Sequence, residues 1–341
     1  MIKVGLCGMG SMGGHHAQLL LKQKNAQWLA MADPMQEKQK KAREKFGVKK
    51  TYDTAQEMIA TEKLDAVFIC TPTYLHAELA IQALQQGYDV FCEKPMALNN
   101  SETTAMQECA KKTGHILAIG QVLRFWPEYV YLKKIIDSKK FGALHALSLT
   151  RVGAVSIGYK RWFLDEKRGG TQIFDRHIHD TDTVLWMLGT PDAVKSIGYQ
   201  DDPNLNGGIT HCFTQYIYPN NIAVSAEGSA DAPNNFPFTA AYRAVFDTAC
   251  VEFNSRNTPS ITIYSDTEEV LHPELPASFN CESDLNISSA GAYYAEQLYF
   301  FDCIEKGIQP TIVTPASAAE TIRVVRAEME SVREQKTIRV K

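Results

Sequence analysis

Residues 2–13 read IKVGLCGMGSMG, an apolar run that leads directly into three glycines spaced as G-x-G-x-x-G. The run Ile2–Cys7 predicts a β-strand, and the residues from Met12 onward predict an amphipathic helix. A glycine pattern alone is weak evidence, but a strand before it and a helix after it are the setting in which it binds a dinucleotide. The segment therefore predicts the first strand, loop and helix of a Rossmann fold.

Each glycine of this loop has a separate expected role. Gly8 allows the tight turn, Gly10 lets the backbone approach a pyrophosphate, and Gly13 lets the helix pack closely on the strand. Ser11 and Met12 begin the helix, where free N–H groups and the helix dipole favour phosphate. A glycine-rich turn without a ligand is the alternative, and the complete strand-loop-helix context disfavours it.

Asp33 follows the second expected strand, Gln27–Ala32, and lies 20 residues after Gly13. This is the expected distance for a carboxylate that accepts hydrogen bonds from the adenosine ribose hydroxyls. The same charge would repel a 2′-phosphate, and no arginine follows immediately. We therefore expect NAD(H) in preference to NADP(H), which is not excluded. The alternative is a turn aspartate, since Asp33-Pro34 is common turn chemistry.

The sequence pattern changes near residue 122. Before this point short apolar runs alternate with amphipathic helices, the pattern of right-handed βαβ units and a parallel sheet. After it we expect a long helix at Thr171–Leu188, a β-rich region at Ala193–Leu271, and two closing helices. These features predict an α/β protein with an NAD(P)-binding Rossmann domain at 1–122. A substrate-binding and oligomerisation α/β domain at 123–341 would hold a large, mostly antiparallel open sheet. The last helix is a candidate for packing back on the first domain.

Lys94 stands in the sequence Glu93-Lys94-Pro95, directly after the expected strand Val90–Cys92. Open α/β sheets bind their ligands at the carboxyl ends of parallel strands. A lysine at this position can therefore contact both a cofactor and a substrate. An ordinary surface lysine is the alternative.

A second group of polar residues, Asp175, His179 and Asp182, shares one face of the long expected helix, because the spacings are four and three. Alcohol oxidation by NAD needs a base for the hydroxyl proton, and histidine suits neutral pH. Asp175 could orient His179, while Lys94 could stabilise alkoxide charge. Asp182 would contact substrate or pair with a nearby cation. The alternatives are a structural helix histidine and, less favoured, a metal site.

The composition excludes several classes of protein. The 341 residues carry a net charge of −4, and no basic run suits a nucleic acid. No apolar run approaches the ~18 residues of a membrane helix, and the chain starts in a strand rather than a signal peptide. The eight cysteines form no C-x-x-C pair and no zinc spacing. We expect a cytoplasmic protein without disulfides that binds no membrane, nucleic acid or metal.

Together these residues resemble the Gfo/Idh/MocA family, which includes inositol dehydrogenases, other sugar dehydrogenases and glucose-fructose oxidoreductase. The resemblance runs through most of the chain, and the order of its motifs makes it specific. They are Gly8-x-Gly10-x-x-Gly13, Cys70-Thr71-Pro72-Thr73 with His76, Glu93-Lys94-Pro95, Gly120-Gln121-Val122-Leu123-Arg124-Phe125, and Gly169-Gly170 followed by Asp175, His179 and Asp182.

The resemblance implies roles at the matched positions. Lys94 would be the catalytic lysine, His179 the acid/base and Asp175 its companion. Further residues would contact the cofactor: Thr71, Pro72 and His76 on the nicotinamide side, Gln121 near the nicotinamide ribose, and Glu93 with Lys94. The Lys94-Pro95 peptide could be cis, as in relatives. The sheet of the second domain commonly forms a dimer interface, often within a tetramer.

Five residues are candidates for contact with substrate: Arg124, Tyr159, Arg161, Trp162 and His177. Trp162 offers a flat face for a sugar ring, and Arg161 could bind a carboxylate or phosphate. His177 stands where many relatives carry glycine, so it could change substrate preference. Core or surface roles for the other four are equally open.

The leading hypothesis is an NAD-dependent oxidoreductase that moves hydride between nicotinamide and a ring secondary alcohol of a cyclic polyol or sugar. One alternative is a dihydrodiol or other carbonyl oxidoreductase of the same family. Another is a non-catalytic NAD(P)-binding regulatory protein. Lys94 and His179 disfavour the regulator, because a pure binder has no need for a proton relay.

Overall fold

The computed structural model describes residues 1–155, 158–200, 208–266, 269–275 and 290–340. The chain folds into two compact units. The first contains Met1–Val122 and a later segment that ends at Ala319, and the second begins at Leu123 and resumes at Glu320. The change of unit after Val122 coincides with the change in sequence pattern.

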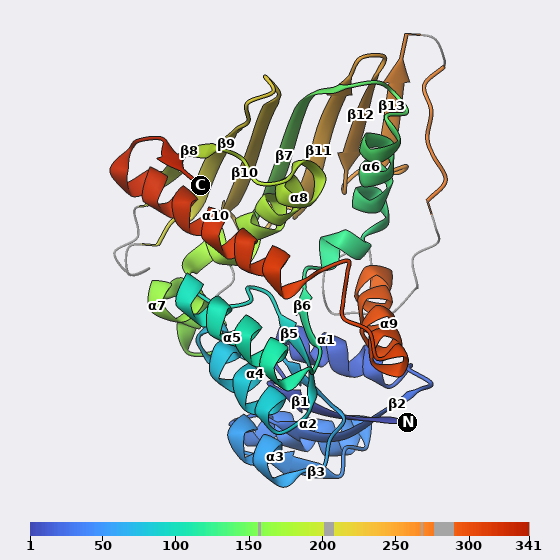
Figure 1. Ribbon diagram of the computed structural model, residues 1–341, viewed down its shortest axis with the longest axis vertical. Coiled ribbons are helices and arrows are strands. Elements are labelled where there is room, and N and C mark those ends of the chain that lie inside the picture. The colour runs from blue at the N-terminus through green and yellow to red at the C-terminus, as the bar shows by residue number, and fades with distance from the viewer. Residues whose placement is uncertain (156–157, 201–207, 267–268, 276–289, 341) are drawn as a thin grey trace. The chain divides into compact units, whose positions relative to one another are not determined.

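The first unit is built on a six-stranded parallel sheet with the strand order β3-β2-β1-β4-β5-β6 (Figure 1). Its strands are β1 (Ile2–Cys7), β2 (Ala26–Ala32), β3 (Lys50–Tyr52), β4 (Ala66–Ile69), β5 (Asp89–Glu93) and β6 (Leu117–Gly120). Its helices are α1 (Ser11–Leu20), α2 (Gln36–Phe46), α3 (Ala55–Thr61), α4 (His76–Gln85), α5 (Asn100–Thr113) and α9 (Ala290–Lys306). The predicted Rossmann arrangement is confirmed.

Helix α9 belongs to this unit because it packs on the aromatic core of the sheet. Phe68 of β4 and Phe91 of β5 stack with ring centroids 4.8 Å apart. Phe300 and Phe301 of α9 lie 5.5 and 5.9 Å from Phe68, and all four side chains are buried. The last helix, α10 (Pro315–Glu334), belongs from Glu320 onward to the second unit. Helix α9 therefore returns to the first unit, and the last helix, α10, belongs to that unit only as far as Ala319.

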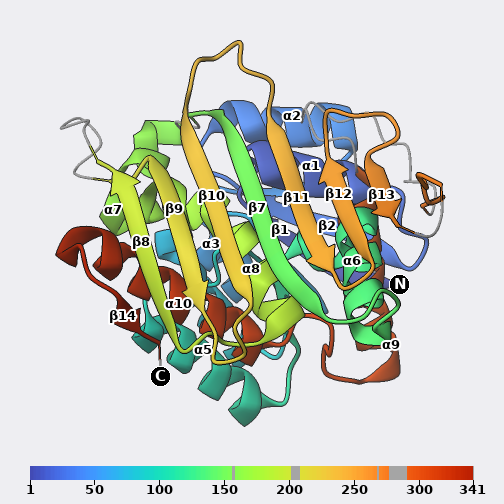
Figure 2. The ribbon, with the colours of Figure 1, turned by 90° about the horizontal axis from the view of Figure 1, so that it is seen from above.

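The second unit is built on an eight-stranded sheet with the order β13-β12-β11-β7-β10-β9-β8-β14 (Figure 2). Every neighbouring pair is antiparallel except β7 with β10. Its strands are β7 (Leu144–Ala154), β8 (Ala193–Tyr199), β9 (His211–Ile217), β10 (Ala223–Ala232), β11 (Thr239–Phe246), β12 (Ala249–Asn254), β13 (Ile261–Ser265) and β14 (Ile338–Arg339). Its helices are α6 (Pro127–Ser138), α7 (Glu166–Gly169), α8 (Ile178–Leu188) and most of α10, joined by short 3-10 segments at Val122–Phe125 and Tyr159–Leu164.

Strand β7, in the middle of this sheet, was not expected from the sequence. Its inward face carries Leu147 and Leu149 but also Arg151, which is 5% exposed. A buried charge of this kind interrupts the alternation that identifies a half-buried strand. Arg151 is tolerated because its guanidinium binds Asp180 of α8 through two hydrogen bonds of 2.9 and 3.0 Å.

The two faces of the eight-stranded sheet differ within the second unit. Helices α8 and α10 lie on one face (Figure 2), and inward side chains such as Tyr216 of β9 reach them. Alternate residues point to the opposite face, where Ile197, Phe213 and Ile217 are between 41% and 62% exposed. No helix in the described part of the chain is both long enough and apolar enough to cross a membrane.

Candidate active site

The glycine loop has the geometry that its sequence predicts. Gly8 has φ +84°, and a methyl group there would lie 2.7 Å from the Cys70 carbonyl oxygen. A methyl group on Gly13 would lie 2.0 Å from the Gly8 carbonyl oxygen, so helix α1 can approach the loop only through glycine. Gly10 faces open space, and no side chain caps the amino end of α1. The free N–H groups of Ser11 and Met12 are thus available to a phosphate.

Asp33 ties the end of β2 to this loop. Its carboxylate accepts hydrogen bonds from the backbone N–H of Met9 at 2.8 Å and of Met35 at 2.9 Å. Each oxygen keeps a lone pair that a ribose hydroxyl could use. A cavity of about 180 Å³ beside the loop is lined by residues that include Gly10, Ser11 and Lys38. The exposed backbone of the loop and the nearby lysine suit the phosphates of a dinucleotide. The carboxylate of Asp33 suits its adenosine ribose.

The turn after β4 carries Thr71, Pro72 and His76. The hydroxyl oxygen of Thr71 is buried and has no hydrogen-bond partner among the described residues, so it remains available to a cofactor. The ring of His76 is buried between two backbone carbonyls, with Nδ1 2.8 Å from Pro95 O and Nε2 2.9 Å from Thr71 O. Burial lowers the pKa of His76. The neutral ring lies between the turn after β4 and the turn after β5 and donates its one N–H to one of these two carbonyls.

Lys94 follows β5 directly and is half-buried. The preceding side chain, Glu93, is 5% exposed and accepts hydrogen bonds from His16 Nε2 at 2.7 Å and from the Lys94 N–H at 3.0 Å. The predicted cis peptide Lys94-Pro95 is confirmed. Gln121 is buried directly after β6, the strand beside β5. His16 is not among the predicted site residues. The sequence of a helix with two consecutive histidines does not indicate that both are buried.

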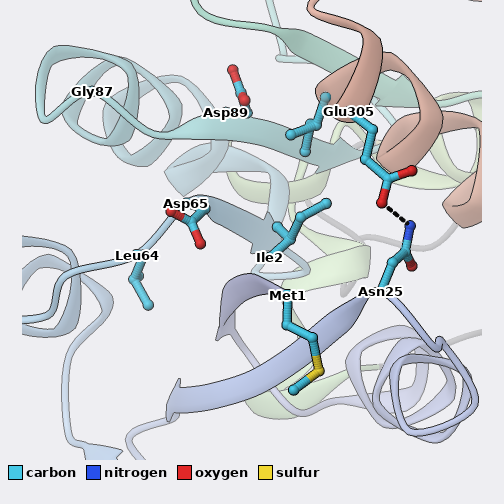
Figure 3. A pocket seen from close by; sticks show the side chains of 9 residues that line it. Met1, Ile2, Asn25, Leu64, Asp65, Gly87, Asp89 and Glu305 are labelled. Atoms are coloured by element: carbon cyan, nitrogen blue, oxygen red, sulfur yellow. Dashed lines mark hydrogen bonds between the residues drawn. The ribbon is translucent and has the colours of Figure 1, made fainter.

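A larger cavity of the first unit, about 480 Å³, lies at the opposite edge of the sheet (Figure 3). Asp65 and Asp89 stand there at the amino ends of β4 and β5, and Asn25 donates a hydrogen bond to Glu305 at 2.8 Å. Both aspartates also accept backbone N–H groups, Asp65 from Lys3 and Asp89 from Ile116. Because open α/β sheets bind ligands at the carboxyl ends of their strands, we assign no function to this cavity.

In the second unit, Asp175 and His179 are both half-buried on the segment that leads into α8. The expected continuous α-helix over Thr171–Leu188 is wrong in one turn, because Ile173–His177 is a π-helical turn. The Ile178 N–H accordingly reaches back to the Ile173 carbonyl, five residues earlier. π-helical turns inside α-helices are frequent at functional sites. This turn changes the direction of Asp175 relative to the α-helical positions of His179 and Asp182.

Two buried ion pairs hold α8. Asp182 accepts hydrogen bonds from Arg124 Nε at 3.0 Å and Nη2 at 2.7 Å, and from the Thr321 hydroxyl at 2.9 Å. Asp180 binds Arg151 in the same two-pronged way. Of the two roles open for Asp182, pairing with a cation is the one observed. Arg124 is 6% exposed, which favours a core role over contact with substrate.

The other candidate substrate residues lie in different surroundings. His177 is 1% exposed, and its Nε2 lies 3.1 Å from the Thr214 hydroxyl, so its position is in the core. Arg161 is exposed and has φ +55°. Trp162 is half-buried and stacks on Phe163 with ring centroids 3.8 Å apart. Tyr159 begins the 3-10 segment that carries both.

A buried carboxylic acid of α10, Glu328, contacts α8. Glu328 of α10 has no exposed surface, and its carboxyl oxygens lie 3.1 and 3.2 Å from the Thr181 hydroxyl. Burial raises the pKa of Glu328 to about 8, and burial lowers the pKa of His177, 3.6 Å away, to about 3. Both groups are therefore neutral at pH 7, and their contact is not an ion pair. Tyr216, Cys212 and Asp180 complete the titratable surroundings of Glu328.

Glu328 makes stability depend on pH. The unfolded chain releases this proton near pH 4.5 and the folded chain near pH 8, so the Glu328 contribution makes unfolding easier as pH rises between these values, by at most about 1.4 kcal/mol per pH unit. His177 contributes the opposite slope below pH 6.5, because its pKa is lowered from 6.5 to about 3. We therefore predict that Glu328→Gln removes the downward slope of stability from urea unfolding curves recorded between pH 7 and pH 8. Glu330→Gln, an exposed change on the same helix, should keep the slope. Equal slopes in wild type and Glu328→Gln would contradict the prediction.

Comparison with known proteins agrees with this geometry. The chain is 26% identical to the scyllo-inositol 2-dehydrogenase (NAD(+)) of Bacillus subtilis, over 97% of this chain and 94% of that protein. It is 32% identical to the myo-inositol 2-dehydrogenase of Thermotoga maritima, over 55% of each. Among solved structures, levoglucosan dehydrogenase in complex with NADH and levoglucosan has the same fold, with a TM-score of 0.86, 20% identity and coverage of 99% of both chains.

Two family models match successive parts of the chain. The Gfo/Idh/MocA model described as an oxidoreductase family with an NAD-binding Rossmann fold matches residues 2–121. The model of the Gfo/Idh/MocA C-terminal domain matches residues 129–250. Together they cover most of the chain and correspond to its two units. The protein therefore belongs to the Gfo/Idh/MocA oxidoreductase family, with an NAD-binding Rossmann domain as its first unit.

Proposed function

We propose that this protein oxidises a ring secondary alcohol of a cyclic polyol or sugar to a ketone with NAD⁺, and catalyses the reverse reduction. Family membership and the inositol dehydrogenases among its relatives support this substrate class. The observation that carries the proposal is the position of Lys94. It follows β5 at the carboxyl edge of the sheet, and β5 is separated from the glycine-loop strand β1 only by β4.

The proposed reaction assigns one proton and one hydride. The carbinol hydrogen leaves as hydride for NAD⁺, which supplies the electron acceptor when bound. His179 takes the hydroxyl proton, a task for which an imidazole side chain is suited near neutral pH. Asp175 orients the His179 ring, and the Lys94 ammonium stabilises the developing alkoxide. The products are the ketone, NADH and a protonated histidine, which returns its proton to solvent.

The dinucleotide would be held by the first unit. Gly10, Ser11 and Met12 offer backbone to the pyrophosphate, and Asp33 accepts from the ribose hydroxyls of the adenosine. Thr71 and Gln121 lie at the ends of β4 and β6, on either side of Lys94, and would contact the nicotinamide end. The carboxylate of Asp33 opposes the 2′-phosphate of NADP(H), which supports NAD(H) as the working cofactor.

Lys94→Ala tests the catalytic assignment. An NAD-reduction screen over inositols, aldoses and sugar phosphates should first identify a substrate for the wild type. With that substrate Lys94→Ala should lose roughly 10²-fold or more in kcat, because a charged group at the reacting oxygen is removed. Calorimetry should find NAD affinity nearly unchanged, and Lys63→Ala, an exposed lysine of the same unit, should behave as wild type.

Two results would count against this function. Full turnover by Lys94→Ala would remove the lysine from the chemistry. Binding of NAD without turnover of any compound in the screen would instead favour the non-catalytic regulatory protein.

We propose in addition that the protein forms a homodimer or homotetramer through the exposed face of the eight-stranded sheet. Ile197, Phe213 and Ile217 expose large apolar side chains on strands β8 and β9. Apolar groups gathered on a sheet face are stabilised when a second copy covers them. In the Gfo/Idh/MocA family the sheet of the second domain commonly forms a dimer interface.

A charge on this face should separate the subunits. We expect light scattering coupled to size exclusion to find an oligomer for wild type and a lower mass for Phe213→Glu, because a carboxylate would be buried without a partner. Leu21→Glu, which changes an apolar side chain of the first unit that is 52% exposed, should leave the mass unchanged. A monomeric wild type would refute the proposal.

A further inference from the structure

The first unit contains a buried chain of polar side chains that ends at the backbone of Lys94. Its members are Gln297 of α9, His16 of α1 and Glu93 at the end of β5. Gln297 and His16 have no exposed surface, and Glu93 is 5% exposed. A buried polar group costs free energy unless it is hydrogen-bonded. The direction of each hydrogen bond in this chain therefore has consequences for the next.

The orientation of the Gln297 amide follows from a backbone carbonyl. The amide nitrogen lies 3.3 Å from the His16 carbonyl oxygen and 2.8 Å from His16 Nδ1. The amide oxygen accepts a hydrogen bond from Gln23 Nε2 at 3.3 Å. Turning the amide over would place its oxygen against the His16 carbonyl, and two acceptors cannot bond. The NH₂ group of Gln297 therefore faces His16.

This orientation determines which nitrogen of His16 carries the proton. Because an NH₂ group can only donate, Nδ1 must accept, and neutral His16 has its proton on Nε2. Nε2 then donates to Glu93 Oε1 at 2.7 Å. Burial opposes ionisation of Glu93, but the hydrogen bonds from His16 and the Lys94 N–H and the nearby positive charge together outweigh it, and the pKa of Glu93 lies below its usual value.

Glu93, held by His16, is also hydrogen-bonded to the backbone of Lys94. Its second oxygen accepts the Lys94 N–H at 3.0 Å. On the other side of Lys94, the buried ring of His76 packs with Nδ1 2.8 Å from the Pro95 carbonyl oxygen. The space for the Glu93 carboxylate is limited, since a methyl group on Gly120 would lie 3.2 Å from Glu93 Oε2. The backbone that carries Lys94 is thus fixed on both sides.

We propose that Gln297 is a positioning residue for the reaction. By donating to His16 Nδ1 it keeps that nitrogen unprotonated and fixes the ring, whose Nε2–H then holds Glu93 where it fixes the peptide that carries Lys94. A residue 281 positions along the chain from His16 thereby controls the placement of the catalytic lysine. The inference rests on the proposed function of Lys94.

Gln297→Leu removes the donor and keeps a side chain of similar size. Because the Glu93 carboxylate keeps a proton on Nε2, we expect long-range ¹⁵N NMR to find Nδ1 of His16 unprotonated in wild type and protonated as well as Nε2 in Gln297→Leu. The kcat should fall roughly 10-fold to 10²-fold, because a misplacement of about 1 Å in a catalytic group can cost about 10²-fold in rate. The NAD affinity should stay nearly constant. Gln297→Met serves the same purpose if the leucine variant does not fold.

Gln23→Leu is the matched control. It removes a glutamine from the same network but leaves the contact between Gln297 and His16, so tautomer and kcat should stay close to wild type. Two results would overturn the proposal: a His16 Nδ1 that stays unprotonated in Gln297→Leu, or a wild-type kcat in Gln297→Leu when Lys94→Ala is inactive. A fully active Lys94→Ala would overturn the role of Lys94 itself, so the two failures are distinguishable.

Discussion

The buried carboxylate of Glu93 is the constraint on which the carboxyl edge of the first sheet depends. A carboxylate inside a protein needs hydrogen bonds to both oxygens, and here they come from His16 on α1 and the N–H of Lys94. His16 is in turn held by Gln297 of α9. One buried charge thus joins the first helix, the fifth strand and a helix from the far end of the chain.

The second unit also buries carboxylates, and it neutralises them with arginine side chains. Asp180 and Asp182 are buried on α8, and each is neutralised by an arginine from another element, Arg151 of β7 and Arg124. Loss of one partner from a buried pair typically costs about 3–5 kcal/mol, so these contacts strongly favour a single position of α8. The candidate acid/base His179 lies on the same helix, one residue before Asp180. Residues that hold charge in the core therefore also set the positions of residues proposed to move a proton.

Features that depend on residues close together in the sequence could be predicted from the sequence. The glycines of the loop, the strand end at Lys94 and the parallel sheet implied by βαβ units all follow from neighbouring residues. Strand β7 could not be recognised because Arg151 occupies an inward position, and its partner Asp180 is 29 residues away. The π-helical turn at Ile173–His177 has no sequence signal that separates it from an α-helix. The link from Gln297 to His16 spans 281 residues, so only the folded chain reveals it.

Lys94 and His179 are proposed to act in the same reaction step, in which the lysine stabilises the alkoxide and the histidine takes the hydroxyl proton. A double-mutant cycle with Lys94→Ala, His179→Ala and the combined variant tests this proposal, with NAD affinity measured for all three. If the residues act together, the combined variant should lose about as much in kcat/KM as the worse single variant. If the two losses multiply, the residues act independently and the account is contradicted.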